Sequence, residues 1–258
     1  MGDILKDRNA LITGASRGIG FAIATRFAEE GANLLLCSRN EGSLGKAAKE
    51  LRQSKGTVKT WTADVTDQPA MKEMVKEALE EFGHIDILIC NAGIADMALT
   101  WDITEEWWDM MLDVNLKGYW LAVKYVVPQM LAQQTGGRII MTSSVAGLRG
   151  EPGMAHYCAS KWGVIGLAKS LAQELAPHNI TVNTLHPTAV NTDIITGMAK
   201  ASEMATEELV DFIYQSHAMP VRLIEAEDVA NAALWLTSEE ARYVTGQKLK
   251  IDAGRMLK

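Results

Sequence analysis

The sequence predicts a doubly wound α/β fold, in which helices cover both faces of a seven-stranded parallel sheet. Seven short apolar runs alternate with longer stretches of helical spacing, and they lie at residues 10–12, 34–37, 58–61, 85–89, 138–141, 180–183 and 248–251. Strands that are apolar along their whole length are typical of a parallel sheet covered on both sides. A glycine-rich turn follows the first run and opens a helix, which is the arrangement of a Rossmann fold.

The chain is expected to form one domain, residues 1–258, because no linker, repeat or low-complexity tract divides it. Helical spacing is clear at 20–30 and 70–82, and a longer helical stretch runs from 104 to about 133. Asn115 lies within this stretch, where Asn is unfavourable, so we expect it to cap or kink the helix or to hold a water. Residues 189–222 are irregular. We predict a lid over a substrate there, and a surface loop with a helix is the alternative.

The composition excludes several classes of partner. The chain has 258 residues, 48% of them apolar, a formal net charge of −7 and no basic run of the kind that binds nucleic acid. No segment approaches the apolar length of a membrane span and the N-terminus has no apolar signal region, so we expect a soluble, cytoplasmic protein without a membrane partner. Cys37, Cys90 and Cys158 show no C-x-x-C spacing, which predicts neither a disulfide framework nor a metal site.

The turn Thr13-Gly14-Ala15-Ser16-Arg17-Gly18-Ile19-Gly20 is a candidate phosphate site. Glycines permit a tight turn and a close backbone approach, and the start of the following helix offers free N–H groups at the positive end of its dipole. The spacing is G-x-x-x-G-x-G, which differs from the G-x-G-x-x-G of the standard dinucleotide motif. A glycine-rich turn without a ligand is the alternative interpretation.

The second strand ends at Cys37-Ser38-Arg39, where a cofactor with a free ribose 2′-hydroxyl usually meets an acidic residue. No acid is present at this point. Ser38 can donate a hydrogen bond to a 2′-phosphate, and Arg39 and Arg17 can flank that phosphate with charge-assisted bonds. The pattern favours NADP(H), and the alternative is that both arginines are simply solvated.

Tyr157 and Lys161 lie four residues apart and share one face of a predicted helix. A nearby ammonium lowers the pKa of a phenol, which makes Tyr a usable acid and base. Ser144 follows the fifth strand at the edge where ligands of α/β proteins bind. His186 is a base by chemistry, but it precedes Pro187 in a turn, and we favour a structural role for it.

Taken in order and at their separations, these motifs resemble those of the classical short-chain dehydrogenases/reductases over nearly the whole chain. The resemblance is carried by Thr13-Gly14-x-x-x-Gly18-x-Gly20, Asp64-Val65, Asn91-Ala92-Gly93, Asn115, Ser144, Tyr157-x-x-x-Lys161 and Pro187 through Thr192. It implies that Tyr157 is the general acid in reduction and the general base in oxidation, and that Lys161 lowers its pKa and holds the nicotinamide ribose. It further implies that Ser144 orients the carbonyl and that Asn115 holds a water linking Lys161 to solvent.

The resemblance also implies where the cofactor binds. The first turn would line the pyrophosphate, Asp64 and Val65 the adenine, Asn91 the adenosine side, and Val190 and Thr192 the carboxamide. The full set of predicted cofactor-binding residues is Gly14, Ser16, Arg17, Gly18, Ile19, Gly20, Ser38, Arg39, Asp64, Val65, Asn91, Ala92, Gly93, Tyr157, Lys161, Pro187, Val190 and Thr192. Val145, Met154 and Met198 are predicted to line an apolar substrate pocket.

Two positions depart from the family pattern. Cys90 stands where an Asn is usual, and Thr188 replaces the Gly that usually follows Pro187, which adds a side chain near the nicotinamide. The turn 186–188 and the ending 243–254 are similar to carveol-dehydrogenase-like members. The extra segment that those members carry after the second strand is missing, so the subfamily is left unassigned.

The expected function is reversible hydride transfer between NADP(H) and a small-molecule ketone or secondary alcohol. An NAD(H)-dependent alcohol dehydrogenase, a lyase or epimerase of the same fold, and a cofactor-binding sensor are the alternatives. The resemblance also suggests a homotetramer in which the helices carrying Asn115 and Tyr157 pack against their symmetry mates. Apolar surface for this contact is offered by Trp120, Trp162, Leu121, Leu167 and Leu171, and packing in the core is the alternative for these residues.

Overall fold

The seven predicted strands form one parallel sheet in the order β3-β2-β1-β4-β5-β6-β7. The computed structural model describes residues 3–202 and 204–257. The strands are β1 (Asn9–Thr13), β2 (Asn33–Ser38), β3 (Val58–Thr62), β4 (Ile87–Cys90), β5 (Gly137–Thr142), β6 (Ile180–Pro187) and β7 (Lys248–Ile251). The predicted fold class and each predicted strand are confirmed. The strand order reverses between β1 and β4, and ligands of such sheets bind at the carboxyl ends of the strands near this point.

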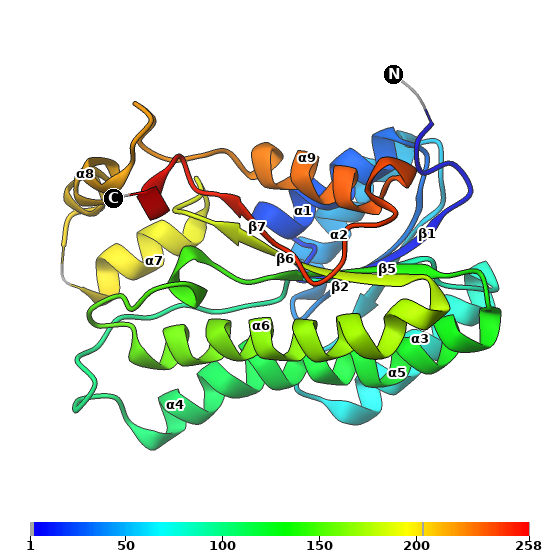
Figure 1. The fold of residues 1–258 in the computed structure, drawn as a ribbon, viewed down its shortest axis with the longest axis horizontal. Coiled ribbons are helices and arrows are strands. Elements are labelled where there is room, and N and C mark those ends of the chain that lie inside the picture. The colour runs from blue at the N-terminus through cyan, green and yellow to red at the C-terminus, as the bar shows by residue number, and fades with distance from the viewer. Residues whose placement is uncertain (1–2, 203, 258) are drawn as a thin grey trace.

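Helices cover both faces of the sheet, as Figure 1 shows. On one face lie α1 (Gly18–Glu29), α2 (Glu41–Glu50) and α9 (Ala226–Thr237), and on the other lie α3 (Gln68–Phe82), α5 (Gly118–Gln133) and α6 (Ala155–Leu175). The strand residues alternate between the two apolar cores, since Leu11 packs with the α3–α5–α6 layer and Ile12 with the α1–α9 layer. All three cysteines are free and buried, as small core residues.

The long helical stretch predicted from residue 104 is interrupted by a π-helical turn. It consists of α4 (Glu105–Leu112), the π-helical segment Asp113–Lys117 and α5, and Asn115 lies inside the π-helical segment. A π-turn leaves backbone groups out of the regular ladder and is frequent at functional sites. Asn115 therefore lies where the helix departs from α-helical geometry, and the expectation that it holds a water stays a prediction.

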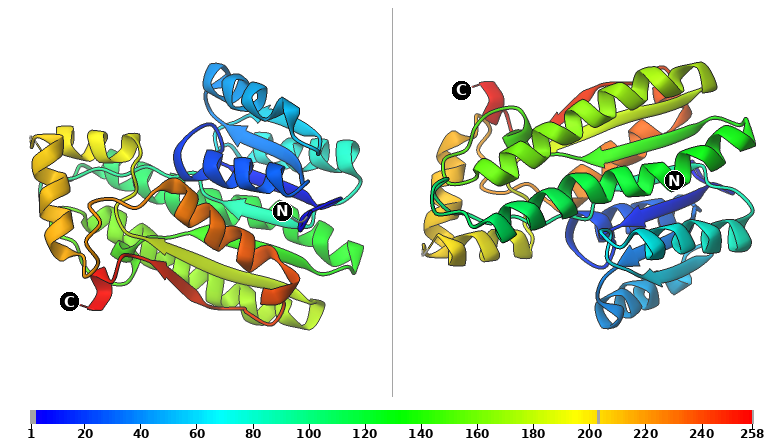
Figure 2. Two further views of the ribbon diagram at one scale, coloured as in Figure 1. Left: turned by 90° about the horizontal axis from the view of Figure 1, so that it is seen from above. Right: turned by 90° about the horizontal axis from the view of Figure 1, so that it is seen from below.

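Residues 189–222 build a separate small layer at one end of the sheet. It contains α7 (Asp193–Ala201) and α8 (Thr206–Ser216), which Figure 2 shows in yellow and orange beyond the main layers. The two helices share an apolar cluster of their own, formed by Ile195, Ala199, Leu209, Val210 and Ile213. This region therefore packs mostly on itself, above the carboxyl ends of the strands.

Short 3₁₀ turns complete the described chain at Leu51–Gln53, Val145–Gly147, Ala176–His178, Glu239–Ala241 and Arg255–Leu257. Within the described ranges, none of the helices has the length and apolar character that crossing a membrane requires.

Candidate active site

One cavity of about 970 Å³ opens at the carboxyl ends of the strands. Its walls come from the glycine-rich turn, the ends of β2, β4, β5 and β6, the start of α6 and the two helices α7 and α8. Most predicted site residues line it, namely Gly14, Ser16, Arg17, Gly18, Ile19, Ser38, Arg39, Val65, Asn91, Ala92, Gly93, Ser144, Val145, Met154, Tyr157, Lys161, Pro187, Val190, Thr192 and Met198. Gly20, Asp64 and Asn115 are not part of its wall.

The glycine-rich turn is built for close backbone approach. Gly14 has φ +67° and Gly18 has φ +55°, a region that favours glycine. A Cβ atom on Gly20 would clash with the carbonyl oxygen of Gly14, so this third glycine lets α1 start directly against the turn. The side chain of Arg17, the N-cap of α1, does not cap the helix, which leaves the first N–H groups of α1 facing the cavity end of the turn.

Asn91 ties together the ends of three neighbouring strands. Its backbone N–H donates to the hydroxyl of Thr13, its side-chain amide donates to the carbonyl oxygen of Gly14, and its Oδ1 accepts from the hydroxyl of Thr142. The amide therefore holds the glycine-rich turn of β1 against the ends of β4 and β5. This is a structural basis for the Asn at this position that the motif alone did not give.

The residues predicted to choose between NAD and NADP make contacts within the protein. The hydroxyls of Ser16 and Ser38 lie 2.9 Å apart, and Arg39 lies 3.5 Å from a carboxylate oxygen of Asp64. Arg17 forms an exposed ion pair of 2.8 Å with Asp193 at the start of α7. Both guanidinium groups are thus exposed and each has a carboxylate partner.

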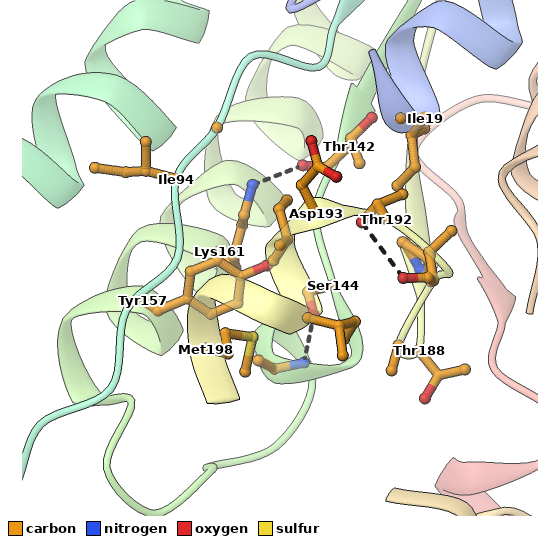
Figure 3. A pocket seen from close by; sticks show the side chains of 18 of the residues that line it. Ile19, Ile94, Thr142, Ser144, Tyr157, Lys161, Thr188, Thr192, Asp193 and Met198 are labelled. Atoms are coloured by element: carbon orange, nitrogen blue, oxygen red, sulfur yellow. Dashed lines mark hydrogen bonds between the residues drawn. The ribbon is translucent and has the colours of Figure 1, made fainter. Parts of the chain in front are cut away.

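Tyr157 and Lys161 are brought together on α6 as the spacing predicts, and Ser144 faces them from the end of β5 (Figure 3). Nζ of Lys161 is buried, donates to the carbonyl oxygen of Thr142 at 3.0 Å and lies 5.6 Å from the centre of the Tyr157 ring. The phenol of Tyr119 donates to the same carbonyl oxygen at 3.1 Å. Tyr119 has no sequence signal, because it is one of many apolar positions along α5.

Burial dominates the titration of this pair in the protein by itself. It raises the pKa of Tyr157 to about 12, against the opposing effect of its hydrogen bond with Ser144. It also lowers the pKa of Lys161 to about 7. Burial sets the direction of this pKa shift, and the expectation that Lys161 lowers the pKa of Tyr157 during catalysis stays a prediction. At neutral pH the phenol keeps its proton.

Asn115 acts on the cavity through the loop after β4. Its Oδ1 accepts from the backbone N–H of Ile94 at 2.8 Å, and its amide donates to the carbonyl oxygen of Ile94 at 2.9 Å and to the hydroxyl of Ser160. A Cβ atom on Gly93 would lie 3.2 Å from this Oδ1 and 3.5 Å from Nζ of Lys161. Asn115 thus fixes the backbone beside Lys161, and the predicted water bridge stays a prediction.

Val145, Met154 and Met198 lie in the cavity wall, and their role in binding a substrate stays a prediction. Further apolar wall comes from Ile94, Met97, Ile195, Met204, Leu209, Phe212 and Ile213. Met219, which lies within the segment 189–222, is 59% exposed and is not part of the wall. It lies between α8 and α9, and its backbone N–H donates to the carbonyl oxygen of Ala253 at 3.0 Å.

A charged cluster in this wall, formed by Arg149, Glu151 and Arg255, was not predicted from the sequence. Glu151 accepts from Arg149 at 2.9 Å and from Arg255 at 2.9 Å, and all three side chains line the cavity. Glu151 and Arg255 are 104 residues apart, so no local pattern could reveal the pair. Over the part of the chain that the structure describes, no group of three or more His, Cys, Asp or Glu side chains could hold a metal ion.

Comparisons with known proteins agree with this geometry. Residues 14–255 match the family model described as enoyl-(acyl carrier protein) reductase. The (-)-trans-carveol dehydrogenase of Rhodococcus erythropolis is 40% identical over 269 residues, which cover 96% of this chain and 97% of that protein. The 3-oxoacyl-[acyl-carrier-protein] reductase FabG of Thermotoga maritima is 39% identical over 253 residues, covering 98% and 99% of the two chains.

Solved structures show the same likeness in three dimensions. Carveol dehydrogenase from Mycobacterium avium in complex with NAD superimposes with a TM-score of 0.94 at 34% identity, over 99% of each chain. Levodione reductase gives a TM-score of 0.92 at 31% identity over 98% of this chain and 99% of its own. With the glycine-rich turn, Ser144, Tyr157 and Lys161 around one cavity, the chain belongs to the short-chain dehydrogenase/reductase family of oxidoreductases.

Proposed function

We propose that this protein interconverts a ketone and a secondary alcohol by hydride transfer with NADP(H), and that Tyr157 is the general acid and base. The observation that carries the proposal is that Ser144, Tyr157 and Lys161 share one cavity with the glycine-rich turn. The bound cofactor supplies the hydride, while the protein supplies orientation and a proton. Ser16, Ser38, Arg39 and the uncapped start of α1 are the groups that would hold the cofactor's phosphates.

In the direction of reduction, Tyr157 donates its proton to the carbonyl oxygen as negative charge develops there. Its raised pKa keeps the phenol protonated at neutral pH, so the acid is present before the reaction begins. The Ser144 hydroxyl is the second donor and fixes the direction of the carbonyl. In the direction of oxidation Tyr157 must first lose its proton, and its phenolate then accepts the alcohol proton while the Ser144 hydroxyl holds the alcohol oxygen.

Lys161 is suited to replenish the proton of Tyr157 and to hold a ribose hydroxyl. Its pKa of about 7 lets the amine exchange a proton with a partner near neutral pH. The carbonyl oxygen of Thr142 fixes the position of Nζ at 3.0 Å. These roles follow the family pattern and match the burial and the contacts of the side chain.

The preference for NADP(H) is supported by Arg17, Ser38 and Arg39 and by the lack of an acid at the end of β2. A second candidate is an NAD(H)-dependent alcohol dehydrogenase. It is favoured by the contact of Arg39 with Asp64, which compensates part of the positive charge, and by the NAD complex of the similar carveol dehydrogenase. The two candidates differ only in the cofactor and leave the chemistry of Tyr157 unchanged.

The substrate we propose is an apolar ketone that residues 189–222 cover as a lid. Support comes from the methionine and aliphatic wall of the cavity and from the small separate core of α7 and α8. A lid with its own core moves as a unit at a small cost in contacts to the sheet.

We also propose a homotetramer. Trp107, Trp108, Trp120 and Trp162 are between 38% and 52% exposed on α4, α5 and α6, which is unusual for side chains of this size. Leu121 and Leu171, expected on this surface from the sequence, are buried in the core instead. Light scattering coupled to gel filtration tests the assembly, and a monomer in dilute solution would contradict it.

The decisive experiment follows nicotinamide absorbance during reaction with a panel of prochiral aryl, cyclic and β-keto ketones, with NADPH and NADH in parallel. Faster consumption of NADPH than of NADH is expected. Consumption of NADH alone would overturn the cofactor proposal and leave the chemistry standing. Binding of either cofactor without turnover of any ketone would favour a lyase, an epimerase or a cofactor sensor.

A further inference from the structure

His186 lies behind the cavity wall and contacts a catalytic candidate from there. It sits near the end of β6, its side chain is fully buried, and it is not among the residues that line the cavity. Nδ1 of its ring is 2.8 Å from the backbone carbonyl oxygen of Ser144, and Nε2 is 2.7 Å from the hydroxyl of Thr184. The ring thus bridges β6 and the end of β5.

The two partners determine which ring nitrogen carries the proton. A carbonyl oxygen only accepts, so Nδ1 must be protonated to bind Ser144. A neutral ring then has a bare Nε2, which accepts from the hydroxyl of Thr184. The same hydroxyl lies 3.2 Å from the carbonyl oxygen of Gln247, a second possible acceptor of its proton. The shorter contact to Nε2 takes that proton, because a ring protonated at Nε2 would leave a bare Nδ1 facing the carbonyl oxygen of Ser144 at 2.8 Å.

The surroundings keep the ring neutral. Burial lowers the pKa of His186 to about 4, and the positive charges of Lys248, Lys161 and Lys250 act in the same direction, against the hydrogen bond to Ser144. An imidazolium would have to donate from Nε2 as well as from Nδ1. The Nδ1–H tautomer is therefore the one that fits every contact.

The bond to His186 completes the fixation of Ser144. The carbonyl oxygen of Ser144 also accepts the N–H of Gly147 at 3.0 Å, so both of its lone pairs are used. The Ser144 hydroxyl accepts the N–H of Ala146 at 3.1 Å, which leaves its own proton to donate into the cavity. These contacts hold the carbonyl group and the hydroxyl oxygen of Ser144 in place beside Tyr157.

We propose that His186, locked in its Nδ1–H tautomer by Thr184, is a positioning residue that orients Ser144 for catalysis. The inference rests on the proposed role of Ser144 in the ketone–alcohol reaction. His186 itself touches neither substrate nor cofactor. Its effect reaches the reacting carbonyl only through the backbone and the hydroxyl of Ser144.

The test compares His186→Leu, which removes the donor, with His186→Asn, whose side-chain amide takes the place of Nδ1–H. For His186→Leu we expect kcat to fall about tenfold, as for the loss of one buried hydrogen bond, with an unchanged Kd for NADPH. The primary isotope effect with deuterated NADPH should rise, because hydride transfer becomes slower. His186→Asn should recover most of kcat, which a purely structural role would not produce.

A second pair of variants tests whether the hydroxyl of Thr184 holds His186 in its Nδ1–H tautomer. Thr184→Val removes the donor to Nε2 and frees the tautomer, whereas Thr184→Ser retains the hydroxyl and serves as the matched control. We expect Thr184→Val to lower kcat several-fold and Thr184→Ser to leave it near the original value. Solid-state ¹⁵N NMR of histidine-labelled protein, with His186→Asn to assign the signal, reads the tautomer independently of turnover.

The outcomes separate the two proposals. An Nε2–H tautomer in the original protein, or equal kcat for folded His186→Leu and the original protein, would overturn the positioning role. Equal losses in His186→Leu and His186→Asn, at equal stability, would overturn it as well. If the original protein binds NADPH and turns over no ketone, the proposed function fails, and the tautomer measurement still decides whether the lock exists.

Discussion

The hydroxyl of Thr188 lies 2.9 Å from Nε2 of His217, and both side chains are buried. Nδ1 of His217 is 2.7 Å from the carbonyl oxygen of Val221, so Nδ1 carries the proton and Thr188 donates to Nε2. His217 directly follows α8, and Thr188 lines the cavity just after β6. The side chain that replaces the family's usual Gly therefore ties the base of the proposed lid to the end of β6.

Thr188→Val keeps the size of this side chain and removes one buried hydrogen bond. The cost is about 1 kcal/mol, so we expect KM for the ketone to rise about fivefold and Tm to fall by a few degrees. Thr188→Ser retains the hydroxyl and should behave like the original protein in both measurements. Equal effects of the two substitutions would show that the methyl group, and not the hydrogen bond, matters for the lid.

Tyr157→Phe removes the proton donor and leaves the shape of the ring. General acid–base catalysis contributes about 10²- to 10⁴-fold, so kcat should fall by at least about a hundredfold. The Kd for NADPH should change little, since the phenol contributes little to holding the phosphates. Stopped-flow absorbance at the nicotinamide band measures the rate of turnover, and fluorescence titration measures the Kd for NADPH. Retention of full activity would remove Tyr157 from the mechanism.

Arg39→Ala should separate the two nicotinamide cofactors. Loss of a hydrogen bond to a charged group costs about 1.5–3 kcal/mol, so we expect kcat/KM for NADPH to fall about ten- to a hundredfold. The value for NADH should change by less than about twofold, because Arg39 has no phosphate to bind there. Parallel losses with both cofactors would mean that Arg39 acts through its contact with Asp64 on the fold.

The stability of the protein should depend on pH through His186. Its pKa falls from an ordinary value of 6.5 to about 4 on folding. The folded state disfavours protonation of the His186 ring. The contribution of the neutral ring to the free energy of unfolding is therefore fully present above pH 6.5 and is lost as the pH falls through 4. The total is about 3 kcal/mol, at about 1.4 kcal/mol for each pKa unit. Urea unfolding at pH 7 and 4.5 should show a smaller loss in His186→Leu than in the original protein.

The glycine at position 20 should be irreplaceable, whereas Gly45 should not. A Cβ atom at Gly20 meets the backbone of Gly14, so Gly20→Ala should cost about 1–3 kcal/mol and weaken NADPH binding. Gly45 lies inside α2 with open space around it, and Gly45→Ala should stabilise the helix by up to about 1 kcal/mol. Chemical unfolding of both variants gives the comparison, and a neutral Gly20→Ala would contradict the packing of this turn.

Local sequence determined the sheet and the chemistry-bearing motifs. Parallel strands are buried on both faces, so runs such as Leu34–Cys37 are apolar throughout. Such a run can be recognised in the sequence without knowing which strands and helices pack against it. The pairing of Tyr157 with Lys161 was predictable because residues four positions apart lie on the same face of a helix. The glycine-rich turn was equally local.

Only the tertiary structure decided the properties that arise from distant contacts. The raised pKa of Tyr157 comes from burial, which the residues next to it in the sequence do not reveal. The pairs Glu151–Arg255 and Thr188–His217 and the bridge from His186 to Ser144 join residues that are 104, 29 and 42 positions apart. Desolvation and hydrogen bonding depend on which groups the fold brings together, and no periodicity in the chain records that information.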